Sequence, residues 1–231
     1  MILPALRDVF KLFFPNLCVG CGQELLETTQ SICIHCRLHL PHTGFASYSN
    51  NPIEKIFAGR IPILFAHSEF YFSQNGLVQQ MIHQLKYHNN TQVGYFLGEQ
   101  VGSALLHSGR WHPYDYIIPL PMHPKKMHQR GYNQAAIIGK GIETVTQIPL
   151  LEQIVVRNKK TDTQTRKKRT ERWENVADSF TIQDPEALYQ KKILLVDDVI
   201  TTGATLEACG QRILRVEGTQ LGIVSVAYAS K

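Results

Sequence analysis

The hydrophobic positions follow two different periods along most of the chain. Between Leu77 and Leu85 apolar side chains recur every three or four residues, which predicts a helix that ends near Tyr87–His88. Residues 192–199 (KILLVDDV) are apolar at nearly every position before their acids, which is typical of a strand buried on both faces. The same criteria predict further strands at 63–72, 114–120, 154–157 and 221–229, and further helices at 93–106, 133–146 and 204–215.

This alternation of strands and helices predicts an α/β fold, with a parallel sheet flanked by helices on both faces. Ahead of it, residues 2–14 predict a short amphipathic helix that stops at Pro15. Residues 41–62 are rich in Gly, Ser, Asn and Pro and are interpreted as a linker or irregular connection. We therefore expect two domains, a small one over residues 1–43 and a larger one over residues 44–231.

The composition narrows the class of protein. Of the 231 residues, 43% are hydrophobic and 19% are charged, which fits a chain with a buried core and argues against long disorder. Arg7, Asp8 and Lys11 interrupt the opening segment, so the sequence does not predict a signal peptide. No apolar run approaches the roughly 18 residues that a membrane-spanning helix needs. We expect a cytoplasmic protein.

Four of the five cysteines form two C-x2-C pairs that are separated by eleven residues. Each pair can turn two thiolates toward one point, and two pairs complete a tetrahedral sulfur shell for zinc. Two disulfides are the alternative, but a cytosolic chain keeps its thiols reduced. The pattern therefore predicts a small structural zinc module. Its ligands would be Cys18, Cys21, Cys33 and Cys36. Cys209 is left over on a predicted helix and is interpreted as a small buried residue.

The strongest chemical signal stands at the end of the predicted strand over residues 192–199. Asp197 and Asp198 lie where open α/β sheets bind ligands, and adjacent carboxylates can accept hydrogen bonds from a vicinal diol such as that of ribose. The turn that follows opens a helix, whose first N–H groups favour a phosphate dianion. This turn consists of Thr201, Thr202, Gly203, Ala204 and Thr205. The combination predicts a clamp for ribose 5-phosphate. The alternative, in which the threonines only cap the helix, leaves the adjacent charges unexplained.

The formal net charge of +5 is unevenly distributed, because residues 123–172 hold twelve Lys and Arg against four Asp and Glu. A basic stretch attracts phosphates, and the interspersed Tyr132 and Trp173 are suited to stacking on the bases of a single strand. The alternative is a solvated loop with Trp173 packed beneath it. The candidate nucleic-acid-binding residues are Lys159, Lys160, Arg166, Lys167, Lys168, Arg169 and Arg172. Residues 1–43 carry no net charge, so we expect a structural or docking role for the zinc module.

Residues 193–205 (ILLVDDVITTGAT) resemble the signature with which the type I phosphoribosyltransferases bind 5-phosphoribosyl 1-pyrophosphate, abbreviated PRPP. With the cysteine pairs included, the chain resembles the ComF family of competence and DNA-utilisation proteins, also called ComFC- or GntX-like. Further segments match the layout of that family. They are residues 85–87 (LKY), 119–121 (PLP), 129–134 (QRGYNQ) and 157–172, with Asn175 and Phe180 downstream.

The resemblance implies a type I phosphoribosyltransferase-like domain preceded by a zinc-finger module with four cysteine ligands. It implies that Asp197 and Asp198 hold the ribose hydroxyls, and that they are the catalytic pair if there is turnover. Residues 201–205 would hold the 5-phosphate, and residues 159–172 would correspond to a mobile loop that closes over the site. The candidates for the pyrophosphate, which Mg2+ would bridge to the ribose, are Lys125, Lys126 and Arg130.

The resemblance thus implies a competence or DNA-utilisation protein that binds PRPP with Mg2+ and supports the uptake or processing of single-stranded DNA in the cytoplasm. Other competence proteins are possible partners. An active phosphoribosyltransferase with an unidentified acceptor is the alternative, and a purely structural adaptor for other competence factors is a third reading. Since a fold alone does not decide function, the sequence leaves open whether the chain is an enzyme.

Overall fold

The computed structural model describes residues 15–27, 30–110, 113–157 and 179–230. The helix expected at residues 2–14 and the basic stretch at 159–172 lie outside them. The helices are α2 (Ile34–Leu38), α3 (Pro52–Phe57), α4 (Leu77–Tyr87), α5 (Thr91–His107), α6 (Pro124–Arg130), α7 (Gln134–Thr146) and α9 (Ala204–Ile213), with 3-10 turns η1 (Phe45–Ser47) and η2 (Glu186–Leu188). The strands are β1 (Phe65–Tyr71), β2 (Tyr116–Pro119), β3 (Val155–Arg157), β4 (Phe180–Ile182), β5 (Lys192–Ile200) and β6 (Gln220–Tyr228).

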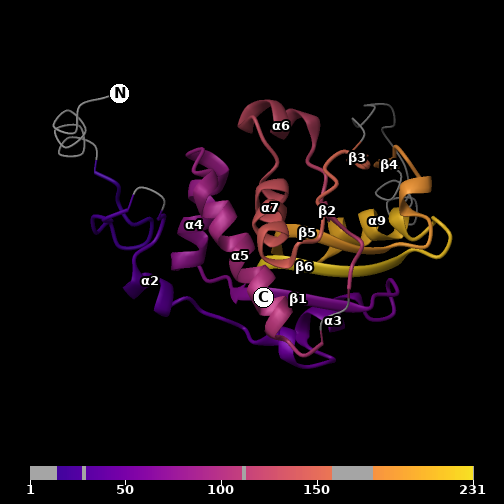
Figure 1. The fold of residues 1–231 in the computed structure, drawn as a ribbon, viewed down its shortest axis with the longest axis horizontal. Helices are drawn as coiled ribbons and strands as arrows, with labels where there is room; N and C mark the ends of the chain where they lie inside the picture. The colour runs from indigo at the N-terminus through magenta and orange to yellow at the C-terminus, as the bar shows by residue number, and fades with distance from the viewer. Residues whose placement is uncertain (1–14, 28–29, 111–112, 158–178, 231) are drawn as a thin grey trace, which may run out of the picture.

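The main sheet is parallel throughout and has the strand order β1-β6-β5-β2 (Figure 1). Alternate residues of β5 enter opposite layers of the core. Leu194 and Val196 pack with α4, α5 and α7, whereas Ile193 and Leu195 pack with α3 and α9. This is why the strand is apolar at successive positions. The predicted α/β fold, a parallel sheet flanked by helices on both faces, is confirmed.

Two glycines let α5 and α7 pack closely against each other on one face of the sheet. A Cβ atom on Gly98 would lie 2.1 Å from the backbone oxygen of Ile138, and one on Gly141 would lie 2.2 Å from the backbone oxygen of Tyr95. Neither distance is sterically possible, so both positions require a residue without a side chain. The close contact fixes α7, whose first turn is capped by the Asn133 side chain.

The interpretation of residues 41–62 as a linker is wrong, because this segment is packed against the sheet. It contains η1 and α3, and the side chains of Phe45, Ile53 and Phe57 are buried in the core. Asn51 is fully buried and organises the segment. Its Oδ1 accepts from the backbone N–H groups of Ile53 and Glu54, which caps α3 as Ser, Asp and Asn commonly do. The high Gly, Ser and Asn content reflects turns and caps in an ordered segment.

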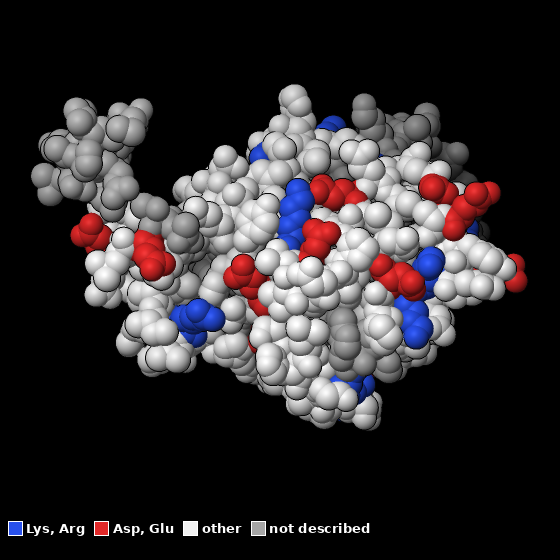
Figure 2. Space-filling view, viewed as in Figure 1, with Lys and Arg blue, Asp and Glu red and all other residues white. Residues whose placement is uncertain are grey.

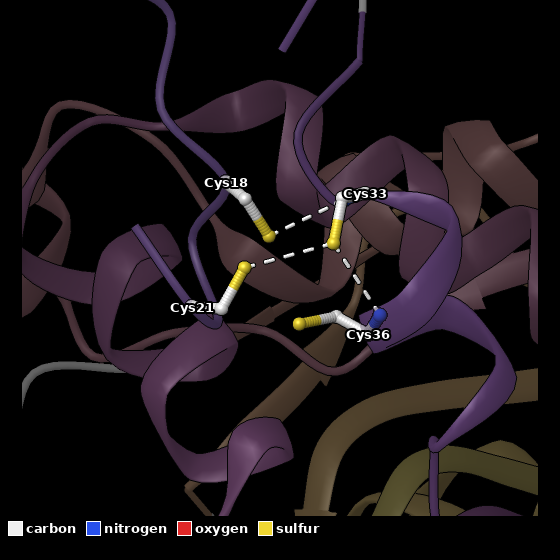
Figure 3. A group of neighbouring side chains, drawn as sticks. All are labelled: Cys18, Cys21, Cys33 and Cys36. Carbon is white, nitrogen blue, oxygen red and sulfur yellow. Dashed lines mark hydrogen bonds between the residues drawn. The ribbon is translucent and has the colours of Figure 1, made fainter. Parts of the chain in front are cut away.

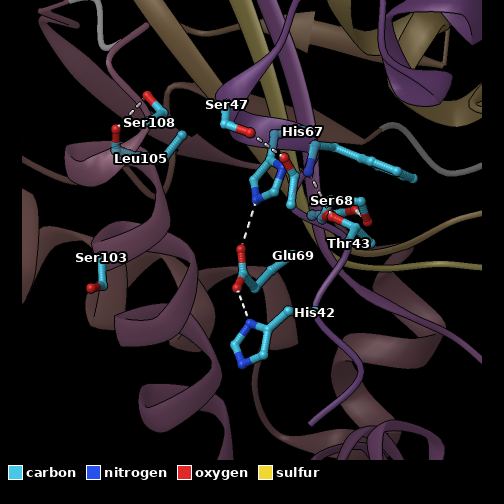
Figure 4. A network of polar contacts seen from close by, with 12 residues as sticks. His42, Thr43, Ser47, His67, Ser68, Glu69, Ser103, Leu105 and Ser108 are labelled. Carbon is cyan, nitrogen blue, oxygen red and sulfur yellow. Dashed lines mark hydrogen bonds and ion pairs between the residues drawn. The ribbon is translucent and has the colours of Figure 1, made fainter.

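Residues 41–43 run antiparallel along the free edge of β1. The Tyr71 N–H donates to the carbonyl oxygen of Pro41, and the Thr43 N–H donates to that of Glu69. The buried Glu69 carboxylate is also shared by two imidazoles, His42 at 2.5 Å and the fully buried His67 at 2.8 Å (Figure 4). A polar group buried this deep needs such hydrogen-bond partners. The segment that follows the cysteines is therefore fastened to the sheet.

Residues 15–43 also share the core of the larger unit. Cys18, Leu25, Ile32, Cys36 and Leu40 are buried in the same cluster as side chains of β1 and α4. The proposed domain boundary after residue 43 stays a prediction.

Two further differences concern short elements. The loop expected between β2 and α7 contains α6, which begins at Pro124 and ends at Arg130. The next residue, Gly131, has a left-handed backbone conformation. The strand expected at 154–157 is β3, which lies outside the main sheet and pairs antiparallel with the unexpected β4. Within the described ranges, no helix is long and apolar enough to cross a membrane.

We predict that Asn51→Ala lowers the free energy of unfolding by about 2–4 kcal/mol. The change removes the α3 cap and leaves the buried carbonyl oxygens of Phe45 and Ala66 without the Nδ2 donor that lies 3.1 and 2.9 Å away. Urea unfolding measures the loss. Asn90→Ala removes only a long cap bond to the Val93 N–H and should cost about 1 kcal/mol or less. Equal losses of stability in the two variants would contradict the role assigned to Asn51.

Candidate functional site

The acid pair lies at the carboxyl end of β5, as the sequence predicts. The strand ends at Ile200, and α9 begins four residues later at Ala204. Both carboxylates are partly buried, and the Asp198 N–H donates to Oδ1 of Asp197 over 2.8 Å. The turn and the first residues of α9 therefore lie at the same edge of the sheet as the acids.

Lys86, at the end of α4, completes the acid pair. Its Nζ lies 2.6 Å from Oδ2 of Asp198, and both side chains are largely shielded from solvent. One ammonium group therefore faces two adjacent carboxylates. Burial first, and then the charge of Asp198, raise the pKa of Asp197 to about 8, although the Asp198 N–H and the charges of Lys86 and Arg157 act in the opposite direction.

The turn after β5 depends on Gly203. Its φ of +72° is left-handed, and a Cβ there would lie 2.8 Å from Cγ2 of Ile56. Thr201, Thr202 and Ala204 are exposed. Because the first N–H groups of any α-helix have no partner within the helix, the start of the ten-residue α9 presents donors to solvent.

Arg60 holds this turn in place and was missed by the sequence analysis. Its guanidinium donates to the backbone oxygens of Ile56 at 3.0 Å and Thr202 at 2.9 Å, and it pairs with the buried carboxylate of Glu207. It therefore ties the segment after α3 both to the turn and to helix α9. A lone arginine within a segment interpreted as a linker carried no sequence signal of this role.

The candidate pyrophosphate residues differ in the contacts that they make with the segments beside the acid pair. The Arg130 guanidinium lies 5.3 Å from the centre of the ring of Tyr87, the residue that follows Lys86 in the chain. The Tyr132 hydroxyl donates to the carbonyl oxygen of Leu85, which joins the segment after α6 to the end of α4. The segments at 85–87 and 129–134 therefore meet beside the acid pair. Lys125 and Lys126 are exposed on α6 and form no ion pair with any described residue.

The nucleic-acid candidates Lys159, Lys160, Arg166, Lys167, Lys168, Arg169 and Arg172 lie outside the described residues. Arg157, directly before this stretch, ends β3 with its guanidinium 5.4 Å from the centre of the Phe180 ring. The described residues on the face seen in Figure 2 show Lys and Arg side chains interspersed with Asp and Glu. Charges of both signs therefore mix on that face.

The four cysteines converge on one point (Figure 3). Their Sγ atoms all lie within 4.8 Å of one another, and those of Cys21 and Cys33 are 3.6 Å apart. Four sulfurs at the usual distance from a tetrahedral zinc would be about 3.8 Å apart. All five cysteines are free, which excludes the two-disulfide alternative in this structure, and Cys209 is fully buried as expected. The cluster could hold a metal ion.

Backbone donors stabilise the thiolate form that a metal needs. The Cys33 N–H donates to Sγ of Cys18 over 3.2 Å, and the Cys36 N–H donates to Sγ of Cys33 over 3.4 Å. Burial raises the pKa of Cys18, but N–H groups from Cys33, Cys21 and Gly20 together lower it to about 6. Burial and the neighbouring thiols raise the pKa of Cys36 well above its usual range. A negative charge on Cys18 thus opposes the ionisation of Cys36, and a cation at the centre of the cluster would relieve this repulsion.

Comparison with known families places a phosphoribosyl transferase domain over residues 143–231. Adenine phosphoribosyltransferase from Saccharomyces cerevisiae is among the similar solved structures, at 18% identity and a TM-score of 0.35, covering 67% of this chain and 70% of that chain.

Three curated relatives extend the comparison. Competence protein F of Haemophilus influenzae is 25% identical over 218 residues, covering 93% of this chain and 91% of that protein. Competence protein ComFC of Bacillus subtilis is 22% identical, covering 86% and 78%. The DNA utilization protein YhgH of Shigella flexneri is 27% identical over 138 residues, so the match spans 58% of this chain and 60% of that protein. The chain is a homologue of these competence and DNA-utilisation proteins, which confirms the resemblance seen in the sequence.

We predict that Asp197→Asn stabilises the ligand-free protein increasingly as the pH rises from 5 to 8. With its raised pKa, the folded Asp197 keeps a proton that the unfolded chain releases near pH 4, so the wild type loses stability as the pH rises through about 8. The asparagine variant has no such loss. Urea unfolding at several pH values measures the difference between the two proteins. The exposed Asp184→Asn serves as the control, with a difference from wild type that stays constant. A constant difference for Asp197→Asn as well would contradict the prediction.

Proposed function

We propose that the chain binds PRPP together with Mg2+ at the carboxyl end of β5, and that it supports the uptake or processing of single-stranded DNA in the cytoplasm. The observation that carries the first part is the acid pair, joined to Lys86 and followed directly by the hydroxyl-rich turn into α9. The phosphoribosyl transferase domain over residues 143–231 includes both the pair and the turn.

The residues at this edge suit a sugar phosphate. Asp197 and Asp198 would accept hydrogen bonds from the two ribose hydroxyls. The N–H groups and hydroxyls of residues 201–205 would bind the 5-phosphate at the start of α9. Arg60 touches no ligand in this arrangement; it positions the turn by holding the Thr202 backbone oxygen.

The positive groups beside the acids suit the pyrophosphate. Arg130 can bind a phosphate through two parallel hydrogen bonds, whereas Lys86, Lys125 and Lys126 supply point charges. The carboxylate oxygens and the oxygens of the ligand fit the preference of Mg2+ for hard oxygen donors. The ion would neutralise charge on the pyrophosphate.

The DNA role rests on separate support. Two relatives are named competence proteins and a third is named a DNA utilization protein. The basic stretch from Lys159 to Arg172 adds a segment whose composition suits a phosphate backbone. Other competence proteins are candidate partners.

A second function is favoured by the position of the acids. Asp197 and Asp198 would lie next to the ribose, where positive charge develops if the phosphoribosyl group is transferred. The chain would then be a phosphoribosyltransferase with an acceptor still to be identified. Release of pyrophosphate with a defined acceptor would distinguish this enzyme from a protein that only binds PRPP.

For the cysteine cluster we propose a structural zinc ion within a module over residues 1–43. Four sulfur ligands close the coordination shell, which is typical of structural rather than catalytic zinc. The imidazoles of His35 and His39 stack on each other with centroids 4.4 Å apart.

We predict that PRPP with Mg2+ binds the wild type and does not bind the double variant Asp197→Asn/Asp198→Asn in a calorimetric titration. The variant keeps the shape of the site but removes the negative acceptors for the ribose hydroxyls. Thermal unfolding of the same samples separates lost binding from lost folding, since the first of these changes is expected to stabilise the fold. The control is Asp184→Asn, which should bind as the wild type does. If the wild type binds no PRPP, the proposed site is wrong.

We predict one zinc ion per chain, measured by elemental analysis of the purified protein. Cys36→Ser should lose the ion, because a hydroxyl is a poor substitute for a thiolate ligand. It should also lower the melting temperature of the whole chain, since Cys36 is buried in the same core as α4. Cys209→Ala, which changes a buried cysteine outside the cluster, should keep its zinc. Equal zinc content in the two variants would rule out the assigned ligands.

A further inference from the structure

Helix α4 directly connects the cysteine cluster to the acid pair. At its first residue, Leu77 packs so closely on Gly20 that a Cβ there would lie 2.4 Å from Cδ1 of Leu77 and 3.0 Å from Sγ of Cys36. At its last turn, Lys86 binds Asp198. Eleven residues of α-helix span about 16 Å. A rigid element of this length therefore separates the two candidate sites (Figure 1).

The outward face of α4 carries planar side chains. The helix buries Val78, Met81, Ile82 and Leu85, so Gln80, His83 and Tyr87 point away from the core. Tyr87 is 61% exposed although it is a large aromatic residue. Its ring centre lies 4.7 Å from that of His83, and the Arg130 guanidinium covers it at 5.3 Å. Three flat groups thus follow one another along the surface near the end of α4, whose Lys86 pairs with Asp198.

At the other end of this row a cavity of about 380 Å³ lies between α4 and the cysteine segment. Such a volume is large enough for a small planar ligand. Most of its lining is amide and imidazole, which offers hydrogen-bond donors and acceptors side by side. The lining residues are Val19, Asn75, Gln79, Gln80, His83 and Gln84.

We propose that this α4 face, defined by Gln80, His83, Tyr87 and Arg130, is a platform for the bases of single-stranded nucleic acid. Unpaired bases have exposed flat faces that stack on aromatic and guanidinium groups, and exposed edges that pair with amide side chains. Double-stranded nucleic acid is a poorer match, because its base faces are hidden in the stack. A lipid membrane is also a poorer match, because it would require an apolar protein face.

The platform would direct a strand along α4 toward Lys86 and the acid pair. This inference rests on the proposed function, since only a PRPP site beside Asp198 gives the strand a chemical destination. A base stacked on Tyr87 would lie one residue along the chain from the lysine that binds Asp198. The cavity beside the cysteine segment would hold a second base of the same strand.

The test uses a fluorescently labelled short oligothymidylate and an abasic oligonucleotide of equal length. Tyr87→Ala should weaken binding of the oligothymidylate by roughly 5- to 100-fold, which corresponds to the loss of one stacked base. Binding of the abasic strand should not change, because its phosphates remain. Tyr87→Phe should bind like the wild type, since stacking needs the ring and not the hydroxyl. Tyr189→Ala, at another exposed tyrosine, should also bind like the wild type. Fluorescence anisotropy measures the affinity of the full-length wild type and of these three variants for each oligonucleotide.

A loss of equal size for both oligonucleotides, or no loss for either, overturns the platform. So does a wild type that binds neither oligonucleotide. Because Tyr87 is exposed, we expect the variant to fold, and His83→Ala provides a second variant with the same expected pattern. Calorimetry with PRPP on the same Tyr87→Ala sample decides the proposed function separately: retained PRPP binding with unchanged strand affinity rejects only the platform.

Discussion

The burial of β5 on both faces is the constraint on which the rest of the structure depends. Ile193 and Leu195 face one layer of helices and Leu194 and Val196 face the other, and all four are fully buried. Charged side chains are tolerated on such a strand only where it leaves the two layers. Asp197 and Asp198 stand at that point. Their place at the carboxyl edge therefore follows from the same apolar run that holds the sheet together.

The sequence predicted those parts of the fold and site that local patterns encode. The bounds of α4, α7, β5 and β6 agree with expectation because each has a clear period, cap or turn. The buried bond from Asn51 to Ala66 and the role of Arg60 could not be predicted, since these partners are not local: Ala66 lies on β1, and Thr202 lies far along the chain. The Gly-, Ser- and Asn-rich composition around them suggested a linker, although the segment is packed. Turn residues mark a change of direction but do not indicate whether the chain around them is buried.

The cysteine pattern likewise predicted the cluster of four sulfurs but not the residues that pack against it. Spacing within and between the pairs was enough to bring four sulfurs together, because each C-x2-C turn is a local structure. Spacing says nothing of what the turns pack against. In the structure, Gly20 and Cys36 abut the first residue of α4, and Cys18 and Leu40 enter the main core. A metal bound there would therefore stabilise a helix end as well as its own loop.

The electrostatics of the acid pair cost the ligand-free fold stability, which supports the proposed ligand site. Lys86 pairs with Asp198, and burial first and the charge of Asp198 second raise the pKa of the adjacent Asp197. An asparagine at that position would avoid this cost, and nothing in the packing of β5 requires the acid. Groups that donate hydrogen bonds or bring positive charge would relieve it. The hydroxyls of a ribose would do the first and a divalent cation would do the second, so the proposed binding would be coupled to stability through the same carboxylate.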